Sequence, residues 1–504
     1  MDKFDKWLLI PIILLAAFFV FRILDQSQIM SQFPLDHNND LSSYIGQLNQ
    51  LKQYGFHKLV PNWYNGFISF LTYPPGWFFF TLPIYNLVEN ILVATFISHL
   101  LIYLVGLIFF FIVGKLQKIS ITKTIFFYLV FYANPIAIGN FIKLGRLPEL
   151  SGLTLFIAFF ALLLYFKDNR ITFSGFLLFT LIYSSLIFTQ PSWLIFSTFF
   201  IPGIFILKNK KERLMIALSF AISLLITSFW LFPFITSSIH TLLGTLTGLD
   251  RLLVFNRTFF YDLVFSFIVP LFLFFTALFY FKSIRNEREL LKKEIAFYTV
   301  PLVISFLYFI RVAAFIPVIN KAYPDSYHML FIFLGFLFLL KTPHNSYGKG
   351  ISKLIKLALI LLPIGFIVSS QLVISNFRVH NEVDKEILSI LPNISINDKF
   401  WIMSMPYPTS PLAFYSYGQI YYNLSTPDGW NPVVAPPDYI NDLQSLDKFL
   451  KEKDCKNFTY LANKFKIEEI IGYNQDCVTL KVCGYNPKIM NKDTCLFSKE
   501  IILP

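Results

Sequence analysis

Long stretches without a charged residue recur along this chain, and they limit the folds that it can adopt. One of them, residues 91–113, reads ILVATFISHLLIYLVGLIFFFIV. About 20 helical residues cross the roughly 30 Å hydrocarbon layer of a bilayer, because each residue adds about 1.5 Å. A helix also satisfies its backbone hydrogen bonds within the segment, as lipid requires. Since 55% of the 504 residues are hydrophobic and 14% are charged, the sequence predicts a polytopic α-helical membrane protein.

We expect about eleven membrane spans. The first is expected to be retained rather than removed as a signal peptide, because no small-residue cleavage site follows it. The spans are placed at residues 7–24, 91–113, 122–140, 150–166, 171–189, 191–207, 214–232, 261–281, 295–310, 328–340 and 355–375.

Basic residues indicate the orientation of these spans. They concentrate in connectors such as KNKKER (Lys208–Arg213) and KSIRNERELLKKE (Lys282–Glu294), and Lys and Arg mark cytoplasmic loops. The N-terminus is therefore expected in the cytoplasm and the C-terminal part outside it, in an integral membrane protein, most simply of a prokaryotic plasma membrane. The excess behind the net charge of +12 lies in the membrane half, so it does not indicate a nucleic-acid partner.

Two features of the expected outer segments agree with this orientation. The N-x-S/T sequons all fall there, at Asn256, Asn393, Asn423 and Asn457. The cysteines all fall there too, at Cys455, Cys477, Cys483 and Cys495. Disulfides among them suit an oxidising compartment, with three pairings open and four free thiols as the alternative.

The membrane domain, residues 1–376, contains a long first outer loop at residues 25–76. After Asp40, apolar residues recur at helical spacing until Gly55, which suits a helix end. These apolar residues are Leu41, Tyr44, Ile45, Leu48 and Leu51. The pattern predicts an amphipathic helix that lies on the outer membrane surface. TYPPGW (Thr72–Trp77) then interrupts the chain, because proline disfavours a helix and glycine permits a turn.

Residues 377–504 form the second expected domain, a mixed α/β domain outside the cytoplasm. Charged residues of both signs become frequent there. The runs KFWIMSM and CVTLKVCG are rich in residues that favour strands. The segments Tyr439–Lys453 and Phe458–Phe465 follow helical spacing instead.

The expected span interiors contain no Asp, Glu, Lys or Arg, and His99 is the ionisable residue well inside them. We interpret His99 as a neutral, hydrogen-bonded helix residue rather than a proton relay. Transporters place charges in their spans in spite of a cost of about 2.5–3.5 kcal/mol or more each. The pattern therefore disfavours a transporter and points to chemistry at the outer ends of the helices.

Three charged clusters lie in the expected outer loops. They are Asp36, His37 and Asp40; Lys143, Arg146 and Glu149; and Arg311, Lys321, Asp325 and His328. A carboxylate can act as a general base, and a cation can hold a phosphate and stabilise it as it leaves. Together these groups suit a reaction between an anionic lipid and a hydroxyl group.

Four short motifs carry a resemblance to a known superfamily. They are FPLD soon after the first span, WYNG followed by YPPG, GRLPE in the second outer loop, and FWLFPF at the end of the seventh span. With this layout, residues 1–375 resemble the GT-C glycosyltransferases. Within that superfamily the chain is most similar to prokaryotic polytopic proteins labelled as a pyruvoyl-tetrahydropterin-synthase-related membrane domain, and no residues suggest pterin chemistry.

The resemblance implies a fold and a reaction. GT-C enzymes transfer a sugar from a polyprenyl-phosphate or polyprenyl-diphosphate donor on the outer side of the membrane, with a catalytic acid in the first outer loop. Carried onto this chain, that acid is Asp36, and Asp40 is the second candidate. The alternative role of Asp40 is to cap the helix that follows it. Glu149 resembles the acid of the second loop, and its alternative role is to complement a helix dipole. For His37 two roles stay open: it contacts a metal or the sugar donor, or it is a solvated residue of the loop.

The resemblance also implies sites for the lipid phosphate. Arg146 is the first candidate, with Lys143, Arg311 and His328 after it, although an arginine that contacts any lipid headgroup is the alternative. Many relatives place an arginine where this chain has PDSYH (Pro324–His328). No metal is needed for a monophosphate donor, whereas a diphosphate donor implies a divalent cation such as Mg²⁺ or Mn²⁺ at Asp36 and Glu149.

One departure bears on the acceptor. Oligosaccharyltransferases of the superfamily carry a Trp-Trp-Asp motif, and the nearest text here is TPDGWNP (Thr426–Pro432), which we interpret as a turn with a packed indole. We therefore expect a glycan, lipid or protein hydroxyl as acceptor in a mannosyltransferase-like reaction of the cell envelope. The alternatives are a non-catalytic GT-C-like scaffold and a lipid or glycolipid transporter.

Overall fold

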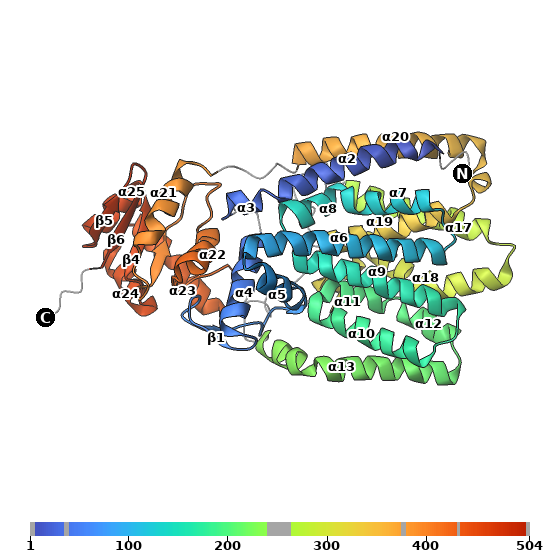
Figure 1. The fold of residues 1–504 in the computed structure, drawn as a ribbon, viewed down its shortest axis with the longest axis horizontal. Coiled ribbons are helices and arrows are strands. Elements are labelled where there is room, and N and C mark those ends of the chain that lie inside the picture. The colour runs from blue at the N-terminus through green and yellow to red at the C-terminus, as the bar shows by residue number, and fades with distance from the viewer. Residues whose placement is uncertain (1–5, 35–39, 239–263, 374–379, 431–433, 500–504) are drawn as a thin grey trace.

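The computed structural model describes residues 6–34, 40–238, 264–373, 380–430 and 434–499. A bundle of long helices carries the C-terminal domain at one end, which we call the domain end. The first helix, α2 (Leu9–Gln26), begins at the opposite end, which we call the far end (Figure 1). Helix α2 therefore runs from the far end of the bundle to the domain end.

Within the described residues, seven helices are long and apolar enough to cross a membrane, or eight if one bent pair counts as a span. They are α2 (Leu9–Gln26, continued by α3 at Ile29–Gln32), α6 (Ile91–Leu116), α9 (Leu147–Asp168), α13 (Lys210–Ser238), α17 (Val269–Ser283), α19 (Pro324–Lys341) and α20 (Gly348–Val373). Other apolar helices are shorter: α5 (Gly76–Val88), α10 (Phe173–Thr189), α11 (Pro191–Thr198) and α12 (Ile201–Leu207). Helix α18 (Arg288–Phe309) begins with charged residues and is not among these seven helices. The expected count of eleven spans therefore stays a prediction.

Helices α9 and α19 lie at the centre of the bundle, where 83% of each apolar window is buried. Phe333 of α19 packs edge-to-face against Phe156 and Phe160 of α9, with ring centroids 5.6 and 5.0 Å apart. A helix that is apolar on all sides is expected in such a central position.

The bent pair joins α7 (Ile121–Ala133) to α8 (Pro135–Ala137) and the π-helix η1 (Ile138–Lys143), with a bend of 49°. Pro135 follows the break, and the Asn134 side chain accepts a hydrogen bond from the backbone N–H of Ala137 at 3.0 Å. Proline and π-turns are common causes of kinks, and π-turns are frequent at functional sites. This break leads the chain into the second outer loop.

The helix expected after Asp40 is confirmed as α4 (Leu41–Tyr54), and Gly55, with φ of 94°, follows it. Its expected position on a membrane surface is wrong, because α4 is covered on its polar face as well. Helix α22 (Pro411–Tyr422) of the C-terminal domain packs along α4, and Gln50 donates to Gln419 in a buried hydrogen bond of 3.0 Å. Sequence spacing along α4 gives no sign of a partner helix so far along the chain.

The C-terminal domain contains a four-stranded sheet with its own apolar core. The strands lie in the order β3 (Phe400–Ile402), β4 (Glu469–Tyr473), β6 (Thr494–Ser498) and β5 (Asn486–Met490). Strands β3 and β4 are parallel, and the other neighbours are antiparallel. The helices are α21 (Glu382–Ile390), α22, α23 (Pro437–Lys451), α24 (Cys455–Phe465) and α25 (Gln475–Val482).

Predictions for this domain have mixed outcomes. Helices α23 and α24 and strand β3 are confirmed. The strand expected in CVTLKVCG is wrong, because the segment forms α25. Cys477 and Leu480 of α25 point into the core, whereas Val478 and Val482 are exposed, so the buried positions follow the helical period in spite of the strand-favouring residues.

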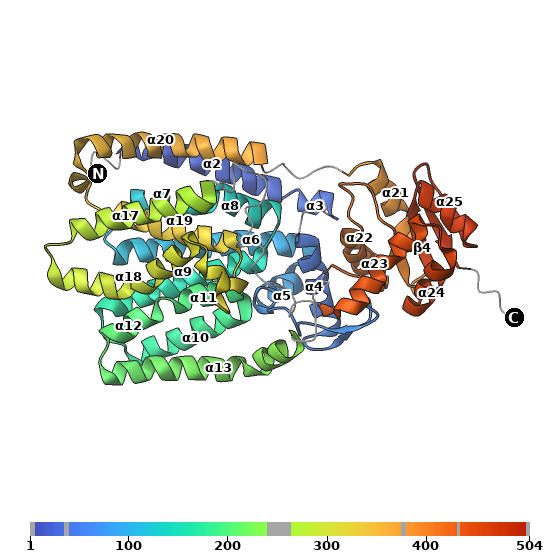
Figure 2. The same ribbon diagram turned by 180° about the vertical axis from the view of Figure 1, so that it is seen from behind.

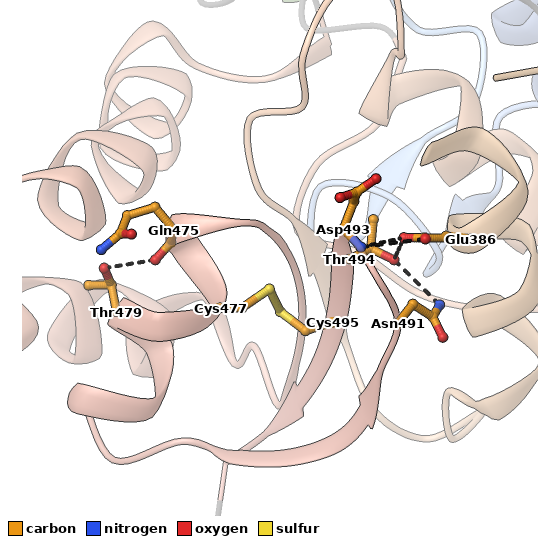
Figure 3. Close-up of a disulfide and its surroundings, with 8 residues drawn as sticks. All are labelled: Glu386, Gln475, Cys477, Thr479, Asn491, Asp493, Thr494 and Cys495. Atoms are coloured by element: carbon orange, nitrogen blue, oxygen red, sulfur yellow. Dashed lines mark hydrogen bonds between the residues drawn. A yellow bond between two sulfur atoms is a disulfide. The ribbon is translucent and has the colours of Figure 1, made fainter. Parts of the chain in front are cut away.

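Two disulfides hold the C-terminal part of this domain together. Cys455 is bonded to Cys483, and Cys477 of α25 is bonded to Cys495 of β6. Figure 3 shows the second bond beside Glu386 of α21, which accepts hydrogen bonds from the backbone N–H of Asp493 and the hydroxyl of Thr494. The disulfide and this acceptor tie both faces of the sheet to helices.

The first outer loop also contacts the C-terminal domain through Trp63, between β1 (Leu59–Val60) and β2 (Phe67–Ile68). Trp63 is fully buried between Gly46 of α4 and Gly429 of the domain, and a Cβ added at either glycine would lie 2.8 Å from its ring. Trp430 packs in the same apolar cluster, which agrees with a packed indole in TPDGWNP. The domain is therefore fixed to the helix that begins after Asp40.

Candidate active site

A single guanidinium lies among three carboxylates at the domain end of the bundle. Nε of Arg146 donates to Oδ2 of Asp40 at 3.1 Å. Its Nη1 lies 3.9 Å from Oε2 of Glu149 and 4.0 Å from Oδ2 of Asp325. Nη1 also donates to Oδ1 of Asn140 at 3.4 Å. We call these five residues the Arg146 cluster.

Asp40 enters the cluster from the first outer loop. Its backbone N–H donates to the carbonyl of Leu144 at 2.8 Å, which joins the first loop to the second. Asp40 occupies the cap position of α4, but its side chain makes no capping hydrogen bond. The alternative role as a helix cap is therefore wrong, since the carboxylate binds Arg146 instead.

Glu149 lies in the first turn of the central helix α9 and is buried. Its Oε1 accepts a hydrogen bond of 2.9 Å from the hydroxyl of Ser326, in the first turn of α19. The neighbouring Asp325 accepts at Oδ2 from Nδ2 of Asn140 at 3.3 Å. The first turns of the two central helices therefore meet at the cluster.

The carboxylates change the chemistry of the guanidinium. Burial lowers the pKa of Arg146, but Glu149, Asp40 and Asp325 more than offset this and raise its pKa. The arginine stays charged, and a quarter of its side chain remains accessible. Its Nη2 has no hydrogen-bond partner among the residues that the structure describes, so one donor remains for a ligand oxygen.

Three tyrosines lie beside the Arg146 cluster. The ring of Tyr323 lies 5.7 Å from Cζ of Arg146, within the range of a cation–π contact. The hydroxyl of Tyr73 donates to the hydroxyl of Tyr44 at 3.1 Å, and burial raises the pKa of both phenols. These side chains stay neutral and can donate or accept hydrogen bonds.

Three of the predicted site residues come together in the Arg146 cluster: Asp40, Arg146 and Glu149. Asp36 and His37 lie outside the described residues. Lys143 is buried in η1, where its charge acts on Asp25 of α2. Sequence reasoning placed Lys143 beside Arg146, but the π-helix turns it toward α2.

Two further predicted phosphate ligands form a group of their own. Nε2 of His328 lies 2.9 Å from the hydroxyl of Tyr308. The guanidinium of Arg311 lies 5.4 Å from the ring of Tyr308, and its charge acts on His328. His328 stands one turn beyond Asp325 in α19, so this group lies along the same helix as the cluster.

Asp325 was named in the third charged cluster without a role of its own, and Ser326 and Asn140 were not predicted as site residues. Asp325 and Ser326 belong to PDSYH, and the proline at the start of this helix was the available signal. Asn140 lies in the π-helix, which no spacing in the sequence indicates. Their roles depend on contacts between segments far apart in the chain.

Some charges lie inside the helices in spite of the expected charge-free interiors. Arg22 and Asp25 of α2 form a buried ion pair of 3.0 Å, so that expectation is wrong for α2. His99 is buried, and its Nε2 has no hydrogen-bond partner among the described residues. Its ring lies 4.8 Å from that of Tyr103.

A divalent cation does not fit the described part of the cluster. The guanidinium of Arg146 occupies the centre toward which the three carboxylates converge. In the described ranges, no three His, Cys, Asp or Glu side chains are arranged to hold a metal ion. A metal site that includes Asp36 falls outside these ranges.

Comparisons with known proteins extend these observations. No protein-family model and no curated protein matches the chain. The structure superimposes on the arabinofuranosyltransferase AftD from mycobacteria over 96% of this chain, with a TM-score of 0.58 and 10% identity. The chain spans 39% of the length of AftD.

An archaeal enzyme is similar to the same extent. The Archaeoglobus fulgidus oligosaccharyltransferase, tethered with an acceptor peptide containing the NVT sequon, matches over 96% of this chain and 74% of its own, with a TM-score of 0.57 and 9% identity. Both proteins are GT-C glycosyltransferases. The chain therefore has the fold of GT-C membrane glycosyltransferases, whereas the narrower resemblance to the pterin-synthase-related label stays an expectation.

Proposed function

We propose that this protein transfers a sugar from a polyprenyl-phosphate donor to an acceptor hydroxyl on the extracytoplasmic side of a membrane, with inversion. The observation that carries the proposal is the Arg146 cluster, which places a partly accessible cation and three carboxylates at the domain end of a GT-C fold. The two disulfides support the outer location of that end, because such bonds persist in oxidising compartments.

A carboxylate of the first outer loop acts as the general base. Asp36 is the residue that the resemblance indicates, and Asp40 is the described alternative. Oδ2 of Asp40 binds Arg146, while its Oδ1 has no hydrogen bond to a described residue, so Oδ1 remains able to accept a proton. The acceptor oxygen loses its proton to this carboxylate and bonds to the anomeric carbon. The bond from that carbon to the phosphate oxygen breaks on the opposite face, and the phosphate leaves as an anion.

Nη2 of Arg146 is the donor available to the leaving phosphate. Charge-assisted hydrogen bonds of this kind stabilise charge that develops in the transition state. The three carboxylates offset the charge of Arg146, so the phosphate requires further positive charge. Arg311 is the predicted residue that supplies it, with His328 beside Arg311, whereas the charge of Lys143 acts on Asp25 of α2. The C-terminal domain covers the site and selects the acceptor, and the absence of a Trp-Trp-Asp motif from the sequence disfavours an asparagine acceptor.

The experiment uses purified protein in lipid nanodiscs and a panel of polyprenyl-phosphate hexoses and pentoses with a radiolabelled sugar. Release of polyprenyl phosphate and labelling of added glycan, glycolipid or peptide acceptors are measured. We expect Asp36→Asn or Asp40→Asn to abolish transfer while the protein stays folded. Asp438→Asn, an exposed acid of the C-terminal domain, is the matched control and keeps activity.

Three outcomes would replace the proposal. Parental transfer in all of Asp36→Asn, Asp40→Asn and Glu149→Gln means that these acids are not the base, and the absence of transfer from every donor indicates a scaffold. Movement of a labelled lipid between leaflets of liposomes without sugar transfer indicates a transporter.

A further inference from the structure

A second buried charged cluster lies at the far end of the bundle, where α18 begins (Figure 2). Glu294 of α18 pairs through Oε1 with Lys167 of α9. Its Oε2 accepts from Nζ of Lys341 of α19 at 3.1 Å. The side chains of Glu294, Lys167 and Lys341 are 1%, 2% and 9% exposed. We call these three residues the Glu294 clamp.

The clamp joins the same two helices that form the proposed active site. At the domain end, α9 carries Glu149 and α19 carries Ser326, and these two are hydrogen-bonded. At the far end, α9 ends just after Lys167 and α19 ends at Lys341. Between the two ends the contacts are apolar, with Phe333 packed on α9. Directional polar bonds therefore hold α9 and α19 together at both ends and apolar packing holds them in the middle.

Stability alone does not explain a buried clamp of this kind. Removal of charged groups from water costs several kcal/mol per ion, and well-packed apolar side chains of similar volume are often as stable or more stable. What charged hydrogen bonds add is direction, since they favour one axial position and one rotation of each helix. The hydrophobic effect that drives the apolar packing between them is non-directional.

We infer that Glu294 is a positioning residue for the active site at the other end of the bundle. By holding Lys167 and Lys341, it sets α9 against α19 and so keeps Glu149 and Asp325 in place around Arg146. This inference rests on the proposed function. A misplacement of about 1 Å at a reacting group is sufficient to cost about 100-fold in rate.

The test compares two ways of removing the clamp. Glu294→Gln removes the carboxylate that the two buried lysines share, while Asp168 stays 3.9 Å from Lys167, and we expect it to lower both thermal stability and activity. The triple variant Lys167→Met, Glu294→Leu, Lys341→Met replaces all three charges by apolar groups and is expected to keep the thermal stability of the parent. Glu289→Gln changes an acid on the same helix whose ion pair is exposed, and it serves as the matched control.

Kinetics of sugar transfer give the first readout. In the triple variant we expect kcat to fall about tenfold or more with KM within about twofold of the parent, because donor binding is kept while the reacting groups are displaced. A folded triple variant with parental kcat would overturn the inference, since the clamp would then have only a structural role.

A second readout does not depend on activity. Ser326 is fully buried, and all four natural cysteines are in disulfides, so Ser326→Cys introduces the one free thiol of the chain. In the Ser326→Cys background we expect slow reaction with a membrane-impermeant maleimide, and several-fold faster reaction once the triple variant is added. Unchanged labelling overturns the inference. Faster labelling, together with no sugar transfer by the parent protein, keeps the inference about the helices and overturns the proposed function instead.

Discussion

Arg146→Ala is the perturbation that acts most directly on the proposed site. The arginine interacts with Asp40, Glu149 and Asp325 at 3.1, 3.9 and 4.0 Å. Its removal leaves these carboxylates close together with no cation between them. Each charge pair at about 4 Å corresponds to about 4 kcal/mol at the effective dielectric constant near a protein surface. Part of this is recovered as the carboxylates regain water or protons, so we expect a net loss of about 3–5 kcal/mol.

The effect on activity is expected to be separable from the effect on stability. Loss of one donor to developing charge costs about 100- to 1000-fold in kcat, and Arg146→Ala removes Nη2. Arg146→Lys keeps the charge but loses the planar fork, which binds several oxygens at once. We therefore expect Arg146→Lys to recover most of the thermal stability and little of the activity.

The assay combines thermal unfolding, followed by tryptophan fluorescence, with sugar transfer in nanodiscs. Arg170→Ala is the control, because Arg170 is exposed and forms no ion pair with a described residue. Parental kcat in Arg146→Ala would refute the reasoning, as would parental thermal stability. Parental kcat would mean that Arg146 does not bind the leaving group, and parental thermal stability would mean that its contacts do not hold the loops together.

Four further predictions concern the C-terminal domain and the chemistry of the site. Gly429→Val places a Cβ 2.8 Å from the ring of Trp63. Such overpacking costs about 1–3 kcal/mol, so we expect a lower Tm and lower activity. In the control Gly418→Ala, the added Cβ lies 3.2 Å from its nearest neighbour, and we expect this variant to be tolerated. Equal Tm values for the two variants would contradict this. Burial raises the pKa of Asp428 to about 7 from a usual value of 3.8. The folded protein thus keeps a proton that the unfolded chain releases, and the free energy of unfolding falls as pH rises from about 4 to about 7. Asp428→Asn should raise the Tm at about pH 8 and not at about pH 4, and the same shift at both pH values would refute the assignment. Reduction of the disulfides is expected to lower the Tm, since each contributes about 2–4 kcal/mol, and an unchanged unfolding curve would contradict that role. EDTA is expected to leave transfer unchanged, because the guanidinium of Arg146 occupies the position toward which the three carboxylates converge. Loss of activity that Mn²⁺ restores would contradict this.

Local patterns in the sequence predict helices better than they predict what covers them. Apolar spacing and Gly55 give the extent of α4, but its polar face is buried by α22, a helix about 370 residues later. CVTLKVCG shows the converse, since its strand-favouring residues form α25. There the positions of Cys477 and Leu480 in the core decide the outcome over intrinsic preference.

The site was predictable where one motif holds several of its residues. GRLPE places Arg146 three residues before Glu149, at the start of a helix. Asn140 could not be predicted, nor could the approach of Asp325 to Arg146, because both depend on the meeting of α19 with a π-helix. The sequence likewise does not show which charges at helix ends pair with one another, as those of the Glu294 clamp do, because the pairing depends on how the helices pack.

A structure of the protein in nanodiscs with bound polyprenyl phosphate tests the central claim most directly. The account predicts a phosphate oxygen within hydrogen-bond distance of Nη2 of Arg146 at the domain end, with a carboxylate of the first outer loop facing the position of the anomeric carbon. A phosphate bound at the far end, or at the domain end beyond the reach of Arg146, would contradict it.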